Sequence, residues 1–265
     1  MSIDFTGLKS IEDSYGKITQ IADANGRVLW SAMNWPDDLD TGLEFASASA
    51  FSISVPSVRW DGTMEYCNGK GWKTWDGSEI SSGETESGQC IYLRGTGNST
   101  ICSIWGSGFD LTGTAIKCNG DIGKLLDYAT VKAGVQPTMA DYCYYYLFDG
   151  CTALAKAPSL PATTLSKSCY EYMFQGCTSL TTLPKLPATA LVGSCYSCMF
   201  RGCSSIKLSA TQTGTYTKAY RIPYSGTGSG SANARISMFS DTGGTFTGTP
   251  SINTTYYLDS SNTIV

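Results

Sequence analysis

Cysteine is the residue type with the most versatile chemistry in this chain, and it occurs 11 times. Cys195 and Cys198 form a CxxC pair, with Cys203 close behind them. Thiolates bind zinc well, but a structural zinc site needs four ligands, and no second pair stands at a suitable spacing. A redox-active CxxC would need a thioredoxin-like βαβ context, which this sequence pattern does not offer. We therefore predict no metal site and no cofactor.

The sequence contains no histidine, which removes the usual base of serine and cysteine nucleophiles. Two carboxylates at a suitable separation could still hydrolyse a glycosidic bond. The acidic candidates all lie between residues 43 and 125: Glu65, Asp76, Glu79, Glu84 and Glu86. Scattered acidic residues are typical of domain surfaces, so we predict a protein without a catalytic site and keep glycan hydrolysis as an alternative.

The cysteines recur because one segment is written three times with a period of 26 residues, at 142–161, 168–187 and 194–209. A fixed period in this range is typical of a solenoid, in which each copy packs against its neighbours. Three stacked thiols cannot all pair, and cysteine behaves as a small apolar residue when buried. We predict a buried column of free thiols, the cysteine ladder, made of Cys143, Cys169, Cys195, Cys151, Cys177 and Cys203.

Within each copy the apolar residues are spaced by four and eight, as at Cys143, Leu147 and Cys151. This spacing predicts a short helix, and the following prolines predict an extended segment after a tight glycine turn. The period fails past Leu208, and we predict that residues 209–265 form a β cap. The glycine- and serine-rich stretch at 225–233 is predicted to be a flexible connection within this cap.

The sequence before the repeats predicts a mainly β protein with short helices. Residues 43–125 carry short apolar stretches bracketed by turn residues, which is typical of an antiparallel β-sandwich. Its predicted strands are 51–58, 62–67, 71–75, 89–95, 100–106 and 114–120. One or two helical turns at 121–131 lead into the repeats, which occupy residues 126–208.

Residues 1–33 are predicted to form a separate N-terminal unit. Alternating stretches at 18–21 and 27–30 flank Asn25-Gly26, the strongest short hairpin signal. A lone two-stranded hairpin is marginally stable in water, so this unit is expected to pack on something else. Residues 34–42 are predicted to be a linker.

Binding is a better supported activity than catalysis, because aromatic side chains are abundant and favour contacts with sugars and proteins. Tyr144, Tyr170 and Tyr196 share one repeat position and are predicted to be structural. Positions that change between copies are predicted to be exposed on one face, joined by two tryptophans of the sandwich. The predicted binding residues are Tyr145, Glu171, Ser197, Asp149, Gln175, Arg201, Trp72 and Trp75.

Charge and hydropathy exclude several classes of partner. The formal net charge is −4 and no basic stripe is present, so we predict no nucleic-acid partner. No apolar run approaches the roughly 20 residues that span a bilayer, so we predict no membrane insertion. The first residues lack the pattern of a secretory signal, and we expect synthesis in the cytoplasm of a bacterial host.

The repeat motif CYxxMFxGCTSLTTLPxLPATxL resembles BspA-like leucine-rich repeats over residues 140–208. The stretches MEYCNGKGWKTW, CIYLRGTGNSTI and NGDIGKLLDYATV resemble the β-domain that precedes such repeats in proteins of gut bacteria and their viruses. The opening, IDFTGLKSI followed by ITQIADANGRVLWSA, resembles the attachment segment of bacteriophage tail and virion proteins.

These resemblances imply a bacteriophage virion structural protein, a tail fibre or receptor-binding component, in the tail of the particle. Residues 1–33 would attach it to other virion proteins, and the remainder would contact a receptor or glycan on the host surface. Such proteins usually assemble symmetrically, and we predict a homotrimer. The alternatives are a BspA-like bacterial surface adhesin and a fibre that decorates the phage head.

Overall fold

The structure is a computed structural model, and it confirms a mainly β chain with antiparallel sheets and short helices. It describes residues 8–14, 17–23, 28–31, 35–57, 60–85, 88–102, 108–226 and 233–265, with the backbone alone in the first three stretches. The predicted turn at Asn25-Gly26, most of the predicted flexible connection at 225–233, and Glu86 lie outside the described residues.

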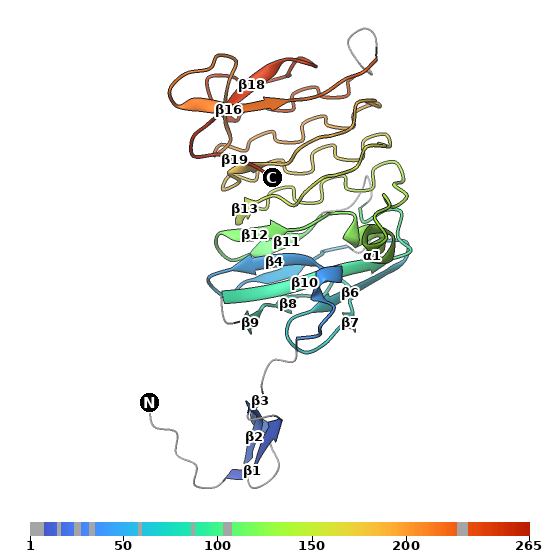
Figure 1. The fold of residues 1–265 in the computed structure, drawn as a ribbon, viewed down its shortest axis with the longest axis vertical. Helices are drawn as coiled ribbons and strands as arrows, with labels where there is room; N and C mark the ends of the chain where they lie inside the picture. Colours follow the sequence, from blue (N-terminus) through green and yellow to red (C-terminus); the bar gives the residue numbers. More distant parts are fainter. Residues whose placement is uncertain are drawn as a thin grey trace.

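A separate three-stranded sheet stands at the N-terminal end (Figure 1). Its strands are β1 (Leu8–Ser14), β2 (Lys17–Asp23) and β3 (Val28–Ser31), in that order and antiparallel. The predicted hairpin is confirmed, because β2 pairs with β3. The strand β1 was not predicted, and it gives this sheet the third strand that a stable small sheet needs.

Two further sheets follow, one of seven strands and one of three (Figure 1). The larger sheet contains β4 (Leu43–Ser47), β6 (Thr63–Cys67), β7 (Lys73–Thr74), β9 (Gly83–Thr85), β10 (Gly88–Thr96), β12 (Ile116–Asn119) and β13 (Leu154–Lys156). The smaller sheet contains β5 (Ser52–Ser54), β8 (Ile80–Ser81) and β11 (Asp110–Thr112). The short helix η1 (Leu39–Thr41) precedes β4, and α1 (Lys124–Lys132) forms where a helix was predicted.

Side chains from both sheets belong to one apolar core. Burial alternates along β4, where Leu43 and Phe45 are fully buried, as expected of a strand with one covered face. Ile53 of the smaller sheet and Ile91 of β10 join the same cluster. The core therefore fixes the two sheets against each other.

The larger sheet continues directly into the repeats. Strand β13 lies in the first repeat, and it pairs in parallel with β12. A bridge between Asp121 and Ser159 extends this contact. Phe109 also donates its backbone N–H to the carbonyl of Leu147, at 2.7 Å. The first repeat thus packs on the sheet, so that the core is continuous from one to the other.

The repeat motifs do not form the predicted helices; each is a run of consecutive turns, which we term a coil. In the first coil, the backbone φ angle is positive at every fourth residue: 64° at Tyr142, 59° at Tyr146 and 71° at Gly150. A right-handed helix needs negative φ throughout, so this backbone cannot be helical. The extended segments are confirmed, since they carry β13, β14 (Thr182–Leu183) and β15 (Lys207–Ser209).

Backbone hydrogen bonds within a coil alternate with bonds to the next coil. Tyr145 and Leu147 donate to carbonyls three residues earlier, at 3.0 and 3.2 Å. The residues between them donate to the second coil instead: Tyr144 to Cys169 at 3.0 Å, Tyr146 to Glu171 at 3.2 Å, and Phe148 to Met173 at 2.8 Å. Every buried N–H needs a partner, and this alternation supplies one without a helix or a continuous strand.

A fourth coil follows at residues 233–242, where the sequence predicted a cap. Its φ angles are positive at Asn233, Ser237 and Asp241, at the same spacing of four. The third coil donates four backbone hydrogen bonds to it, from Tyr196, Cys198, Phe200 and Gly202, at 2.7–2.9 Å. The array is therefore one coil longer than the 26-residue period indicated.

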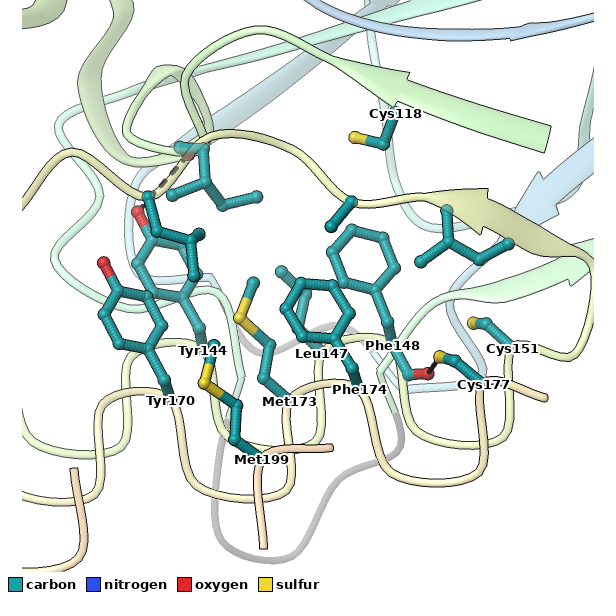
Figure 2. Close-up of a cluster of buried hydrophobic side chains, with 14 of the residues drawn as sticks. Cys118, Tyr144, Leu147, Phe148, Cys151, Tyr170, Met173, Phe174, Cys177 and Met199 are labelled. Atoms are coloured by element: carbon teal, nitrogen blue, oxygen red, sulfur yellow. Dashed lines mark hydrogen bonds between the residues drawn. The ribbon is translucent and has the colours of Figure 1, made fainter. Parts of the chain in front are cut away.

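The aromatic side chains of successive coils stack face to face (Figure 2). Phe148, Phe174, Phe200 and Phe239 form a column with ring centroids 5.4, 5.4 and 5.5 Å apart. Beside it, Tyr144, Tyr170 and Tyr196 form a second column and are each 1% exposed. The prediction that these three tyrosines are structural is confirmed.

The remaining strands cover the end of the array (Figure 1). A four-stranded sheet has the order β16 (Tyr216–Arg221), β18 (Thr255–Asp259), β15, β17 (Gly243–Gly244). Strand β19 (Thr263–Ile264) returns to the second repeat and pairs in parallel with β14. The β strands predicted for the cap are therefore present.

Candidate binding surface

Four tyrosines gather at the surface of the first two coils, and we term them the tyrosine cluster: Tyr142, Tyr145, Tyr146 and Tyr172. The rings of Tyr146 and Tyr172 stack, with centroids 4.6 Å apart and planes 12° from parallel. Tyr145 meets Tyr146 edge to face at 4.4 Å. All four side chains are half-buried. Such a cluster exposes ring surface in a fixed arrangement.

The repeat backbone positions this cluster. Tyr146 and Tyr172 occupy the same position in neighbouring coils, and the hydrogen bond from Tyr146 N to Glu171 O sets the spacing between them. Both have positive φ, 59° and 58°, which a bulky residue adopts only where its surroundings hold it. Because the neighbouring coil fixes the backbone, these rings lose little conformational entropy when a ligand binds.

The hydroxyls of Tyr145, Tyr146 and Tyr172 remain protonated at neutral pH. Desolvation is the main cause that raises the pKa of Tyr145, Tyr146 and Tyr172, to about 12 for Tyr172. The negative charge of Glu171 contributes in the same direction. The cluster therefore combines ring faces, hydroxyl groups and one carboxylate, which is suited to the ring and hydroxyls of a sugar or to a protein surface.

A polar row lies along the next exposed position of the coils. Gln175 donates to a carboxylate oxygen of Asp149 at 3.1 Å. Arg201 and Asp241 form an ion pair at 3.5 Å, in which both side chains are more than half exposed. The predicted exposure of Asp149 and Arg201 is confirmed, and Gln175 is half-buried.

Ser197 is not at the surface, which corrects its prediction as an exposed binding residue. It occupies the repeat position of Tyr145 and Glu171, which are half-buried, but it is only 5% exposed. Its side chain is too short to emerge from this position, and its hydroxyl lies 3.8 Å from the thiol of Cys198. At this repeat position the side chain is therefore half-buried in the first two coils and buried in the third.

The two predicted tryptophans differ in their surroundings. Trp75 is 2% exposed and stacks on Trp60, with ring centroids 5.4 Å apart. Its indole N–H donates to the carbonyl of Ser78, so Trp75 is a core residue. Trp72 is half-buried, and its indole N–H donates to Asp38 at 2.8 Å. The prediction of Trp75 as a binding residue is therefore wrong, and that of Trp72 stays a prediction.

Trp72 belongs to a polar cluster around Arg94, which is itself 8% exposed. The guanidinium lies 3.9 Å from the centroid of Trp72 and 4.6 Å from that of Tyr128. It forms ion pairs with Asp38 at 2.7 Å and with Glu65 at 2.9 Å. Since Asp38 lies in the predicted linker, this cluster ties the linker at Asp38 to β10 and α1.

Two of the acidic candidates for hydrolysis, Glu65 and Asp76, have structural partners. Glu65 pairs with Arg94. Asp76 accepts the backbone N–H of Ser78 at 3.0 Å, and its hydrogen bonds to Ser78 lower its pKa. Glu79 and Glu84 are exposed.

All 11 cysteines are buried and carry free thiols. In the cysteine ladder, three thiols donate to a phenylalanine carbonyl of the preceding layer: Cys151 to Phe109 at 3.1 Å, Cys177 to Phe148 at 3.0 Å and Cys203 to Phe174 at 3.0 Å. Figure 2 shows the second of these bonds. Desolvation raises the pKa of Cys151 to about 12 and of Cys195 to about 11, so these thiols are poor nucleophiles and poor metal ligands.

Sequence reasoning selected Tyr145 but missed Tyr142, Tyr146 and Tyr172. A signal was available, because the first two copies carry tyrosine two residues before the phenylalanine and the third carries Cys198.

Among the described residues, no three histidine, cysteine, aspartate or glutamate side chains are arranged to hold a metal ion. In the same part of the chain, the structure contains no helix long and apolar enough to cross a bilayer.

Comparison with known proteins gives no relative for this chain. No protein-family model, no curated protein and no solved structure matches it.

Proposed function

We propose that this chain is a bacteriophage virion structural protein, a tail-fibre or receptor-binding component that contacts the host surface without catalysis. The proposal rests on the resemblance of its first residues to virion attachment segments and of its repeats to BspA-like leucine-rich repeats. In this proposal the stacked coils are a short solenoid of that kind. The single observation that favours a binding role is the tyrosine cluster, a rigid aromatic surface on an array of coils.

In this proposal two parts of the chain have different roles. The sheet of β1, β2 and β3 is separate from the other sheets and would attach the protein to the particle. The coils would carry the tyrosine cluster towards a receptor or glycan on the host. A homotrimer would present three copies of this surface, and multivalent binding strengthens attachment well beyond the affinity of one site.

The first test is immunogold electron microscopy of particles released from a culture that produces the protein, with an antibody against residues 126–265. We expect label at the tail tips. Label on the heads would make the protein a head-decorating fibre, and label confined to bacterial envelopes would contradict the virion assignment and favour an adhesin.

The binding surface is tested separately, by measuring how purified protein binds to host cells. Tyr172→Ala removes the ring that joins the two coils of the cluster, and we expect binding at least about tenfold weaker, as for a hot-spot tyrosine. The matched control is Thr178→Ala, at an exposed position of the same repeat outside the cluster. Equal binding by the two variants would show that the receptor contacts another surface.

A further inference from the structure

A cavity of about 310 Å³ lies between α1 and the first two coils. Its walls are mostly apolar and include Leu126, Val131, Pro137 and Met139. Val135 also lines the cavity and is 58% exposed, so this wall reaches solvent. The volume is at the lower end of the range found for small-molecule sites and matches a molecule of about one ring.

One residue that lines this cavity carries an unpaired hydroxyl. Tyr170 lines it and is 1% exposed, yet its hydroxyl has no hydrogen-bond partner among the described residues. The equivalent hydroxyl of Tyr144 donates to the carbonyl of Ile122 at 3.3 Å. Figure 2 shows both hydroxyls at the same end of their rings, with a bond drawn from Tyr144 alone. A buried hydroxyl without a partner is unfavourable, and an occupant that reaches the Tyr170 hydroxyl would supply one.

A carboxylate also lines the cavity. Asp121 accepts the backbone N–H of Gly123 through one oxygen, at 2.7 Å. Desolvation raises the pKa of Asp121, and the positive charge of Lys124 acts in the opposite direction. Since Lys124 already compensates part of the carboxylate charge, a neutral donor suffices as a partner for Asp121.

We propose that this cavity binds a small neutral organic molecule with an apolar body of about one ring and a hydroxyl group. The apolar walls would cover the body. A hydroxyl group can accept a hydrogen bond from Tyr170 and can donate one to Asp121, whereas a hydrocarbon can do neither. The site is independent of the tyrosine cluster, which lies on other residues of the coils.

The test compares p-cresol with toluene, which has the same ring and methyl group but no hydroxyl. Binding to the full chain is measured by ligand-observed NMR titration. We expect p-cresol to bind about tenfold more tightly, as one net hydrogen bond implies. Absence of p-cresol binding up to millimolar concentration, or equal affinity for the two probes, would overturn the proposal, as would tighter binding of benzylamine, which would indicate a cation site.

Three single substitutions test whether the probes bind in this cavity. Tyr170→Phe should retain toluene binding and lose the preference for p-cresol, because it removes only the unpaired hydroxyl. The matched control is Tyr144→Phe, whose hydroxyl is already bonded within the protein and whose loss should leave the preference intact. Val135→Trp should weaken the binding of both probes at least about tenfold by filling the mouth of the cavity. Val135 is 58% exposed, so this substitution leaves the core packing unchanged. A preference for p-cresol that survives Tyr170→Phe would contradict the assignment.

Discussion

The third and fourth coils have almost the same backbone but different sequences. Both place a Met-Phe pair at the same position, and the column stacks Phe239 on Phe200 at 5.5 Å. The fourth coil lacks both ladder cysteines and the glycine of the third: Ala234 replaces Cys195, Asp241 replaces Gly202, and Thr242 replaces Cys203.

The comparison separates what the coil requires from what it tolerates. The shared features are the phenylalanine column and the alternating hydrogen bonds, so these specify the backbone. The cysteine is exchangeable, because Thr242 occupies its position and donates to the carbonyl of Phe239 at 2.8 Å. Glycine is exchangeable as well, since Asp241 adopts a φ of 59° in place of 75° at Gly202.

The largest expected effect on the free energy of unfolding follows from removing a phenylalanine ring from the column. Phe174 stacks on a ring at each side, at 5.4 Å, whereas Phe239 stacks on Phe200 alone and meets Tyr220 edge to face. We expect Phe174→Ala to lower the free energy of unfolding by about 3–5 kcal/mol and Phe239→Ala by less. Urea unfolding of the two variants measures the difference. Equal losses would show that the fourth coil is packed as tightly as the second.

The next effect concerns the alkaline stability of the cysteine ladder. Burial raises the pKa of Cys151 from 9.0 to about 12, so the folded state keeps a proton that the unfolded state releases. The contribution of the protonated thiol to the free energy of unfolding is fully present below pH 9. It is lost as the pH rises towards 12, at up to about 1.4 kcal/mol per pH unit for each such thiol. Replacing Cys151, Cys177 and Cys203 by threonine, as in the fourth coil, should flatten the decline measured by thermal unfolding between pH 8 and 10.5. An unchanged slope would assign the decline to the buried tyrosines.

A smaller effect is expected at the positive-φ position of the turns. In Gly176 an added Cβ would lie 3.6 Å from Gly150, an ordinary contact, so the φ of 70° is the main cost of a substitution. We expect Gly176→Ala to destabilise the protein by about 1–2 kcal/mol. Asp241→Gly should stabilise it by up to about 1 kcal/mol, because it relieves the same strain in the fourth coil. A stabilising Gly176→Ala would show that the coil does not impose its φ.

The smallest effect is expected for the polar row. The ion pair between Arg201 and Asp241 is exposed and long at 3.5 Å, and such pairs contribute little. We expect Arg201→Gln to change the free energy of unfolding by less than about 0.5 kcal/mol in urea unfolding. A loss above 1 kcal/mol would mean that this pair helps to hold the fourth coil on the third.

The period of 26 residues was sufficient to predict stacked layers, the buried tyrosines and the exposed positions of Asp149 and Arg201. It was not sufficient to separate a helix from a run of turns. The turns repeat every four residues, as the φ angles at Tyr142 and Tyr146 show, and a helix repeats every 3.6. Apolar residues spaced by four and eight therefore fit both, and the alternating hydrogen bonds that decide between them depend on the neighbouring coil.

Other differences between the predictions and the structure also have identifiable physical causes. The fourth coil was missed because residues 210–232 separate it from the third and break the period, although the Met-Phe pair at 238–239 was a visible signal. The prediction that Trp75 binds a ligand was wrong because the sequence of a short strand does not indicate which of its faces is buried. The tyrosine cluster depends on ring contacts between coils, such as that of Tyr146 with Tyr172, which a single copy of the repeat does not contain.

The parallel pairing of β14 with β19 has a consequence for synthesis of the chain on the ribosome. Asn262 donates to the carbonyl of Thr181, which lies 81 residues earlier. At typical translation rates of about 5–20 residues per second, the second repeat waits roughly 4–16 s for this partner. During that time the edge of β14 is open to pairing with another nascent chain. Neighbouring ribosomes on one message would bring such chains close together, so co-translational association is expected to begin at β14.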